Sequence, residues 1–514
     1  MGGGRMRRAV PEVVAALAAC TLVAALWLRR RSRARRARPS RSPTTVELAP
    51  GIEVDAAPPA RPRGARPQHV VVVGAGIVGA ATAAELTRRG LRVTVLEQES
   101  AAGAKATRCS WAWINANSKR PRHYQGLNRL AMRVWDALLP GRVRWCGAVL
   151  LNGSPQQEDP LYAGAPLTTV EDAAALEPAL STAYLESLGL SADAPARHFP
   201  QEGLTDPQQA VAELVQQAEA RGAVFIYNAR VRGWPWDIEG DITGVSFSRD
   251  GGAVEELKAD VVVLANGTGV QRLAGAAGVP VPLVHKPGVL TWLRPRPEMH
   301  LSKVLVADGL HLLQRPDGLV AVGESKEAGG ASSVAFVSGL SAAGVGGDAS
   351  SDVSPRKDEV EQPDGDIADV HEWNTVGARM LAAAQRLVPG LRDARIEAVT
   401  RGHRPMPEDG LPVVGFVTNS CSTRPPRLYV AVCHSGITLG PMLGAMAALE
   451  VSQGLDLGWL APYRPARFAP GHKAGSLLPA ASAAADGGDG GEAAGEERGG
   501  PRVATPRLAA ARRH

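Results

Sequence analysis

Apolar residues along this chain fall into two alternating patterns: short continuous runs and longer stretches with helical spacing. The runs at residues 69–73 and 91–96 are rich in β-branched side chains, which is typical of strands buried on both faces of a sheet. Strands are also predicted at 143–151 (as a pair), 223–227, 241–247 and 259–264. One helix is predicted to end near residue 90, and two others to span 124–139 and 207–220. Strands that alternate with helices predict an α/β fold.

A strand that runs into a glycine turn occurs twice, nearly 200 residues apart. The first is "VVVGAG" at 71–76 and the second is "VVVLANGTG" at 261–269. We therefore expect a Rossmann-like domain assembled from separated segments, with an α+β substrate domain threaded between them that holds a mixed or antiparallel sheet. The expected dinucleotide-binding segments are about 67–145, 205–275 and 395–455, and the expected substrate-domain segments are about 146–204 and 276–394.

The first glycine turn carries a dinucleotide-binding fingerprint. Gly74, Gly76 and Gly79 have the spacing GxGxxG between a strand and a helix. Gly74 permits the tight turn, Gly76 lets the backbone approach a pyrophosphate, and Gly79 lets helix and strand pack closely. Glu97 ends the second strand, where its carboxylate can accept hydrogen bonds from ribose hydroxyls and disfavours the 2′-phosphate of NADP. The motif itself does not separate NAD from FAD.

Composition and charge narrow the class of protein. The 514 residues, 45% of them hydrophobic, suffice for two packed domains. Residues 1–66 hold 14 Lys and Arg against 4 Asp and Glu, so the remaining chain is slightly acidic and gives no sign of nucleic-acid binding. The five cysteines form no CxxC motif, which predicts no disulfide framework, metal site or dithiol centre. We expect Cys433 to be a small buried hydrophobe.

The basic leader, residues 1–66, is excluded from the expected fold. Its apolar segment 13–28 has 16 residues, which span about 24 Å as a helix against a bilayer core of roughly 30 Å. The segment is therefore interpreted as a signal-type region or a marginal transmembrane anchor, with the body on the cytoplasmic side if it is retained. The Arg- and Ser-rich stretch behind it resembles an organelle transit peptide, so we expect a membrane-associated or organellar protein.

Two further stretches have little bulk to bury. Residues 329–366 form a low-complexity insertion of small and charged residues, and residues 473–514 form a tail without periodicity. Both are predicted to be solvated.

Five ordered motifs resemble the D-amino-acid oxidase-like FAD-dependent oxidoreductases, which include glycine oxidase, sarcosine oxidase and the D-amino-acid dehydrogenases. They are the fingerprint, "QEGLTDPQQAVAELVQQAEARGAVF", "ADVVVLANGTG", "GHRPMPEDGLPVVG" and "LYVAVCHSGITLGPMLGAMAALE". The resemblance covers about 400 residues and implies bound FAD. The stretch "TRCSWAWINANSKRPRHYQGLN" is similar to the variant in mostly uncharacterised bacterial-type members.

The resemblance implies roles for individual residues. Glu97 would bind the adenosine ribose, Thr107 and Ser110 would lie by the pyrophosphate and flavin, the Val231 backbone would meet the adenine, and Gly267 would approach the cofactor closely. The segment Ser435, Gly436, Ile437, Thr438 and Leu439 would begin a helix pointed at the flavin pyrimidine ring, where a positive dipole end stabilises the negative charge of reduced flavin. No cysteine or histidine matches a covalent flavin link, so FAD is expected to be non-covalent.

Arg404 is the predicted substrate residue, because it matches the position at which amino-acid-oxidising relatives hold the substrate carboxylate. A guanidinium offers a bidentate fork to a planar anion. The alternative is an arginine paired with Glu408 or Asp409, or one that is simply solvated. His403, its neighbour, is a second candidate that either contacts substrate or flavin or is a packed neutral side chain.

The implied reaction is oxidation of a C–N bond in a small amine or amino acid. Hydride passes from the α-carbon to flavin N5, and the imine hydrolyses in water. Oxygen or a quinone-type acceptor then takes the electrons. "GLVAVGES" has no lysine where sarcosine oxidases place one for oxygen activation, which favours a dehydrogenase. Two other functions stay open: an FAD-containing assembly or binding factor without amine turnover, and, ranked last, a pyridine-nucleotide:flavin reductase, which would need a second GxGxxG and a cysteine pair.

Overall fold

The structure is a computed structural model that describes residues 44–59, 64–151, 167–324, 370–417 and 427–469. The predicted membrane segment 13–28, the insertion 329–366 and the tail from 473 lie outside the described residues. Across the described part of the chain, no helix has both the length and the apolarity that crossing a bilayer requires. Membrane attachment and organelle targeting therefore stay predictions.

A six-stranded sheet is built from segments that lie far apart in the sequence, as predicted. Its order is β11-β4-β3-β15-β22-β21; all neighbours are parallel except the β22–β21 pair. The strands are β3 (His69–Val73), β4 (Arg92–Leu96), β11 (Val224–Ile226), β15 (Val261–Leu264), β21 (Val413–Phe416) and β22 (Leu428–Val432). From β3 the sheet continues to β4 and β11 on one side and to β15 and β22 on the other, so the gap between β3 and β15 is a topological switch point at which α/β sheets bind ligands.

Both faces of this sheet are covered, which explains its nearly continuous apolar strands. On β3, Val70 and Val72 face one hydrophobic cluster, and Val71 and Val73 face another. The first cluster is shared with α2 (Ile77–Arg88), α3 (Arg122–Leu138), α6 (Pro207–Glu219) and α10 (Gly436–Gln453). The second is shared with α7 (Val270–Ala276) and an antiparallel sheet of β12 (Ala229–Gly233), β13 (Gly244–Arg249) and β14 (Val254–Lys258).

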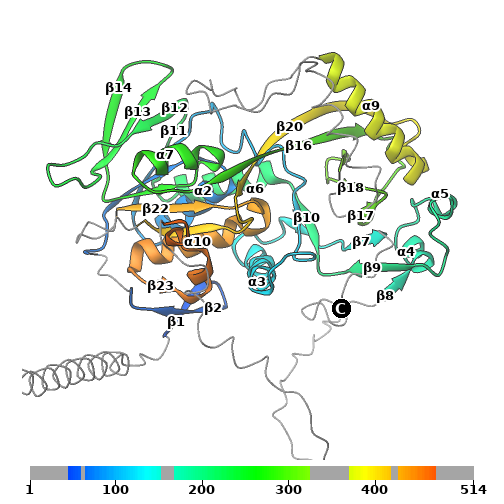
Figure 1. Ribbon diagram of the computed structural model, residues 1–514, viewed down its shortest axis with the longest axis horizontal. Helices are drawn as coiled ribbons and strands as arrows, with labels where there is room; N and C mark the ends of the chain where they lie inside the picture. Colours follow the sequence, from blue (N-terminus) through cyan, green and yellow to red (C-terminus); the bar gives the residue numbers. More distant parts are fainter. Residues whose placement is uncertain (1–43, 60–63, 152–166, 325–369, 418–426, 470–514) are drawn as a thin grey trace, which may run out of the picture. The chain divides into compact units, whose positions relative to one another are not determined.

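A second, eight-stranded sheet is mixed, as expected for the substrate region. Its order is β20-β16-β19-β18-β17-β7-β9-β8, and among these neighbours β17 and β7 alone are parallel. The long strands β16 (Leu283–Arg294) and β20 (Arg395–Pro407) run side by side (Figure 1). The others are β7 (Ala148–Leu151), β8 (Leu167–Thr169), β9 (Pro195–Phe199), β17 (Val304–Ala307), β18 (Leu310–Gln314) and β19 (Val320–Glu324).

The two faces of this sheet have different neighbours. One face packs on α4 (Val170–Leu176), α5 (Thr182–Ser187) and α9 (Val370–Leu387). The other carries Leu290, Trp292 and Leu313 and packs against Trp111 and Trp113. A small antiparallel sheet of β5 (Trp113–Ile114), β10 (Gly203–Thr205) and β6 (Val143–Arg144) brings that tryptophan segment to the inner face. Short 3-10 helices complete the described elements: η2 (Gly267–Gly269), η3 (Pro389–Leu391), η4 (Gly458–Tyr463) and η5 (Pro465–Phe468).

Part of the stretch assigned to the leader belongs to the fold. Thr44–Ala49 (β1) and Ile52–Ala57 (β2) form a hairpin that pairs with β23 (Asp456–Leu457). Alternation along β2 buries Ile52, Val54 and Ala56, while Leu48 and Ala49 are buried on β1. The prediction that the fold begins near residue 67 is therefore wrong. The period-two pattern of "IEVDAA" is a strand signal, although the segment around it is rich in arginine.

Candidate functional site

The glycine turn after β3 packs directly against the turn after β15. Gly74 has a φ of +97°, and a Cβ there would lie 2.7 Å from Asn266 Cα. A Cβ on Gly79 would lie 1.9 Å from the carbonyl oxygen of Gly74, so helix and strand approach as closely as the fingerprint predicts. At Gly76 the nearest atom to such a Cβ is Thr107 Oγ1, at 3.4 Å. The middle glycine therefore faces the least crowded side of the turn.

The N-termini of α2 and α10 lie next to each other. Gly440 and Gly444 of α10 cross α2 closely, since a Cβ on Gly440 would lie 2.9 Å from Ile77 Cγ1 and one on Gly444 would lie 2.6 Å from the Ala81 backbone. At the start of α2, the Ile77 amide donates to Thr107 Oγ1 at 3.2 Å. Two positive dipole ends therefore meet at the switch point, which suits a ligand with phosphate groups.

Glu97 lies at the carboxyl end of β4 with its carboxylate against the glycine turn. Its Oε2 accepts from the Ala75 amide at 2.7 Å, and its Oε1 accepts from the Glu99 amide at 2.9 Å. Burial raises the pKa of this carboxyl, and the two amide hydrogen bonds act in the opposite direction. Each oxygen keeps a lone pair for a further donor, such as a ribose hydroxyl.

Ser435, the N-cap residue of α10, accepts hydrogen bonds from polar side chains in the segment that follows Trp111 and Trp113. Its Oγ accepts from Tyr124 Oη at 2.9 Å and from Lys119 Nζ at 3.3 Å. Burial raises the pKa of Tyr124 to about 12, so its hydroxyl stays a neutral donor at physiological pH. A lysine beside a helix N-terminus strengthens the positive potential there. Sequence reasoning missed Lys119 and Tyr124; the signal was their place in the quoted stretch "TRCSWAWINANSKRPRHYQGLN".

The other predicted residues of this helix start are held by local contacts. Thr438 Oγ1 lies 3.4 Å from both the Asn115 amide and the Trp113 carbonyl. The carbonyls of Ile437 and Thr438 accept from Trp135 Nε1 at 3.1 and 3.0 Å. Leu439 is fully buried and Gly436 lies over Ile77, so the whole start of α10 is fixed in place.

A buried carboxylate holds the loop that leads from Trp113 to Lys119. Glu202, fully buried just before β10, accepts from the amides of Ala116 and Asn117 at 3.1 and 2.9 Å. It also accepts from the side-chain amide of Asn117 at 2.6 Å. Three hydrogen bonds to one buried carboxylate tie the loop to the start of β10.

Arg404 lies on β20 at the inner face of the eight-stranded sheet, partly buried. A Cβ on Gly402 would meet Cys109, and one on Gly288 would lie 2.9 Å from Arg404 Nη2, which places the guanidinium over β16. Burial lowers its pKa, although a guanidinium stays charged. Among the described residues no carboxylate pairs with Arg404, and Asp409 instead pairs with Arg467 at 2.7 Å. The alternative of a local ion pair for Arg404 therefore finds no support.

His311 of β18 faces the same side and was missed by sequence reasoning. Its ring lies edge-on to Trp111 and Trp113, at 5.0 and 5.5 Å between ring centroids. Within the described structure neither ring nitrogen has a hydrogen-bond partner, and the same is true of Trp113 Nε1. Burial lowers the pKa of His311 to about 3, and the positive charges of Arg404 and Lys119 add to this. These unsatisfied polar atoms indicate a place for a polar ligand between the two sheets.

His403 lies on the opposite side of β20 from Arg404. Successive side chains of a strand alternate between faces, and β20 keeps a regular register with β16 from Ala398 to Pro407. Val399, on the same face as His403, packs against Gly377 of α9. At most one of the two predicted residues can therefore face a ligand held between the sheets, and the geometry favours Arg404.

Comparison with known proteins decides the family. Residues 69–449 match the model of the family described as "FAD dependent oxidoreductase". The chain belongs to this family. It is 24% identical over 421 residues to a glycine oxidase of Geobacillus kaustophilus (strain HTA426), covering 77% of this chain and 95% of the relative. It is 26% identical over 424 residues to a glycine oxidase of Pseudomonas aeruginosa, covering 78% of this chain and 99% of the relative.

Solved structures share the fold. The crystal structure of glycine oxidase from Geobacillus kaustophilus matches with a TM-score of 0.58 and 22% identity over 79% of this chain and 99% of that one. An L-proline dehydrogenase from P. horikoshii matches with a TM-score of 0.57 and 20% identity over 78% of this chain and 98% of that one. The predicted fold class and the FAD cofactor are thereby confirmed.

The residues of this FAD-dependent oxidoreductase fit the cofactor. The paired helix N-termini suit the pyrophosphate, Glu97 suits the ribose, and Ser435 with Lys119 suits the electron-rich end of a flavin. Asn266 Oδ1, beside the second glycine turn, is buried without a hydrogen-bond partner among the described residues. Gly267 follows with a φ of +57° and nothing within 4 Å of a Cβ, so there is room for a group at this point.

Two predicted cofactor residues make local contacts in this structure. Ser110 Oγ accepts from the Ala112 amide at 3.1 Å and so shapes the turn before the tryptophans. The Val231 carbonyl accepts from Arg272 at 3.0 Å, and a register shift in β12 follows it. Their contacts with FAD stay predictions, as does the absence of a covalent link. Cys433 is buried, and burial raises its pKa to about 12, as expected for a small hydrophobe.

Proposed function

We propose that this FAD-dependent oxidoreductase oxidises the C–N bond of a small amine or amino acid that carries a carboxylate. The observation that carries the proposal is Arg404: a partly buried guanidinium that no carboxylate of the described residues neutralises, on the inner face of the substrate sheet. A desolvated cation in this position favours an anionic ligand. The similarity to glycine oxidases and to an L-proline dehydrogenase supports the same substrate class.

The chain's own residues would bind and orient the substrate. Arg404 would hold the carboxylate by two parallel hydrogen bonds, which fixes the direction of the α-carbon. Trp111, Trp113 and His311 would form an aromatic wall, and neutral His311 offers one donor and one acceptor to the amine side of the substrate. Bound FAD supplies the hydride acceptor. The substrate would lose its α-hydrogen with two electrons and a proton from its nitrogen, and the resulting imine would take up water to give a carbonyl compound and ammonia or an amine.

Anaerobic titration of the FAD-loaded protein with candidate amines tests this proposal. Glycine, sarcosine, proline and a panel of D-amino acids would be added while the visible absorbance of oxidised flavin is followed. We expect one or more carboxylated amines to bleach the flavin, and Arg404→Ala to raise the half-saturating concentration by about 100-fold, as loss of a bidentate charge-assisted contact implies. Arg404→Lys should recover only part of this, since an ammonium lacks the planar fork.

Arg401→Ala is the matched control. Arg401 is exposed on the same strand but on the other face, so its loss should leave the titration unchanged. Flavin that dithionite reduces but no amine bleaches would contradict the proposal and favour an FAD-containing assembly or binding factor.

A further inference from the structure

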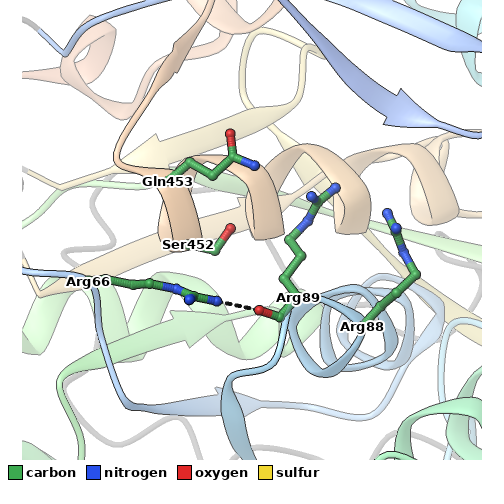
Figure 2. A pocket seen from close by; sticks show the side chains of 5 residues that line it. All are labelled: Arg66, Arg88, Arg89, Ser452 and Gln453. Carbon is green, nitrogen blue, oxygen red and sulfur yellow. Dashed lines mark hydrogen bonds between the residues drawn. The ribbon is translucent and has the colours of Figure 1, made fainter.

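An arginine-rich pocket lies at the end of the Rossmann-like sheet opposite the cofactor site. It has a volume of about 470 Å³ and is lined by Arg66, Arg88, Arg89, Ser452 and Gln453. Figure 2 shows Arg88 and Arg89 at the C-terminus of α2, and Ser452 and Gln453 at the C-terminus of α10. Because the 12 residues of α2 span roughly 18 Å, this pocket is separate from the helix N-termini at the cofactor site.

Two of the three arginines use their guanidinium groups in structural hydrogen bonds. Arg66 Nη2 donates to the backbone carbonyl of Arg89, the hydrogen bond drawn in Figure 2. Arg88 donates to both oxygens of Glu85 at 2.6 to 3.1 Å and occupies that carboxylate. These contacts explain Arg66 as a cap for the end of α2 and Arg88 as half of an ion pair.

Arg89 and Ser452 have donors left over. Arg89 Nη2 lies 3.6 Å from Glu85 Oε2, beyond hydrogen-bond distance, and both Nε and Nη2 are buried without an acceptor among the described residues. Ser452 is 6% exposed, and its Oγ also lacks a partner there. Buried N–H and O–H groups are normally satisfied, so several unused donors around one pocket indicate a missing acceptor.

The charge of the pocket indicates that the missing acceptor is negatively charged. Of the three guanidinium groups, those of Arg88 and Arg89 lie by Glu85, and the exposed Glu47 also acts on both electrostatically. Burial lowers the pKa of Arg89, because Glu85 compensates its charge only in part. A net positive pocket with unused donors fits an oxyanion.

We propose that this pocket binds a phosphate group, held by Arg89, Ser452 and Arg66. The volume is in the range of small-molecule sites, so the phosphate can belong to a small solute or protrude from a lipid headgroup. The site does not depend on amine oxidation, and its test does not use turnover.

Calorimetric titration of the FAD-loaded protein with inorganic phosphate at constant ionic strength tests the site. We expect saturable binding that Arg89→Met weakens at least about tenfold and Ser452→Ala weakens about threefold, in line with the loss of charged and neutral hydrogen bonds. Glu85→Gln should strengthen binding, because it removes the carboxylate nearest to Arg89. Arg404→Ala should leave this binding unchanged, which separates it from an anion at the substrate position.

Arg249→Met is the charge-matched control, since it removes an exposed arginine paired with Glu255 on the β13–β14 hairpin. A second arm measures binding to phosphatidylcholine vesicles with and without phosphatidic acid. Arg89-dependent binding to vesicles alone assigns the phosphate to a lipid, and binding of inorganic phosphate assigns it to a solute. Absence of both, or binding that Arg89→Met and Ser452→Ala leave intact, overturns the proposal. If Arg89→Met does not fold, Ser452→Ala and Glu85→Gln carry the test.

Discussion

The guanidinium of Arg404 occupies the space in which a side chain at Gly288 would lie. The two residues are on neighbouring strands, and a Cβ on Gly288 would be 2.9 Å from Nη2 and 3.1 Å from Cζ of Arg404. The absence of a side chain on β16 therefore sets the position of the proposed carboxylate anchor. Because a guanidinium is the flexible end of a long side chain, it can move aside at small cost to the fold.

Gly288→Ala should therefore affect substrate binding more than stability. We expect KM for a carboxylated amine to rise about tenfold, because the guanidinium loses its alignment with the carboxylate. The melting temperature should change by no more than a few degrees, as for a difference of about 1 kcal/mol. Gly275→Ala on α7 is the control, since nothing lies within 4 Å of its Cβ. An unchanged KM in Gly288→Ala would contradict the role given to this contact.

Glu202→Gln should weaken the hold on FAD. The substitution keeps the shape but places an N–H donor where the carboxylate now accepts three hydrogen bonds from Ala116 and Asn117. The loop to Lys119 then loses its fixed position beside Ser435. We expect the dissociation constant for FAD, measured by flavin fluorescence on dialysis, to rise at least about tenfold, equivalent to ~1.4 kcal/mol. Glu213→Gln on the partly exposed side of α6 serves as the control and should bind FAD normally.

Local patterns predicted those elements whose stability depends on neighbouring residues in the sequence. β3 has the predicted bounds His69–Val73, and α6 begins as predicted at Pro207, where Asp206 accepts from the amides of Gln208 and Gln209. A cap, a proline at the first position and an apolar stripe are all visible within 13 residues. Separated segments in one sheet were predicted for the same reason, because each strand runs into its own glycine turn.

The contacts between the two sheets could not be predicted from local sequence patterns. His311 meets Trp111 and Trp113 from about 200 residues away, and no periodicity relates the three. The side of β20 on which Arg404 lies could be assigned only from the register between β16 and β20. The hairpin of β1 and β2 was different, since its alternation was readable but the arginines around it favoured interpretation as a leader.

The buried ion pair of Glu450 and Arg464 should matter strongly for stability. Glu450 on α10 is fully buried and accepts from both terminal nitrogens of Arg464, from Tyr429 Oη at 2.9 Å and from the Leu457 amide at 2.7 Å. It thus joins α10 to β22 and β23. We expect Glu450→Gln to lower the free energy of unfolding by about 3 kcal/mol, because Arg464 is left without its counter-charge. Urea unfolding measures this.

The exposed pair of Arg249 and Glu255 provides the comparison for that prediction. Both side chains are about half exposed, at 51% and 44%, so water screens their attraction. Glu255→Gln should leave the urea midpoint within experimental error. A loss of stability in Glu255→Gln as large as that in Glu450→Gln would show that burial is not the cause.

His311 should make the protein less stable in mild acid. Its pKa is lowered from the usual 6.5 to about 3, mainly by burial and then by Arg404 and Lys119. Between these values the unfolded chain binds a proton at this residue that the folded protein does not, so stability falls as pH decreases from 6.5 toward 3. The contribution is at most ~1.4 kcal/mol per pH unit.

His311→Phe keeps an aromatic ring beside the tryptophans and removes this proton. The loss of unfolding free energy between pH 7 and pH 4.5, by urea titration, should therefore be smaller in the variant, whereas exposed His300→Phe should retain the wild-type loss. Equal losses in wild type and His311→Phe would mean that the His311 ring accepts a proton in the folded protein despite its surroundings.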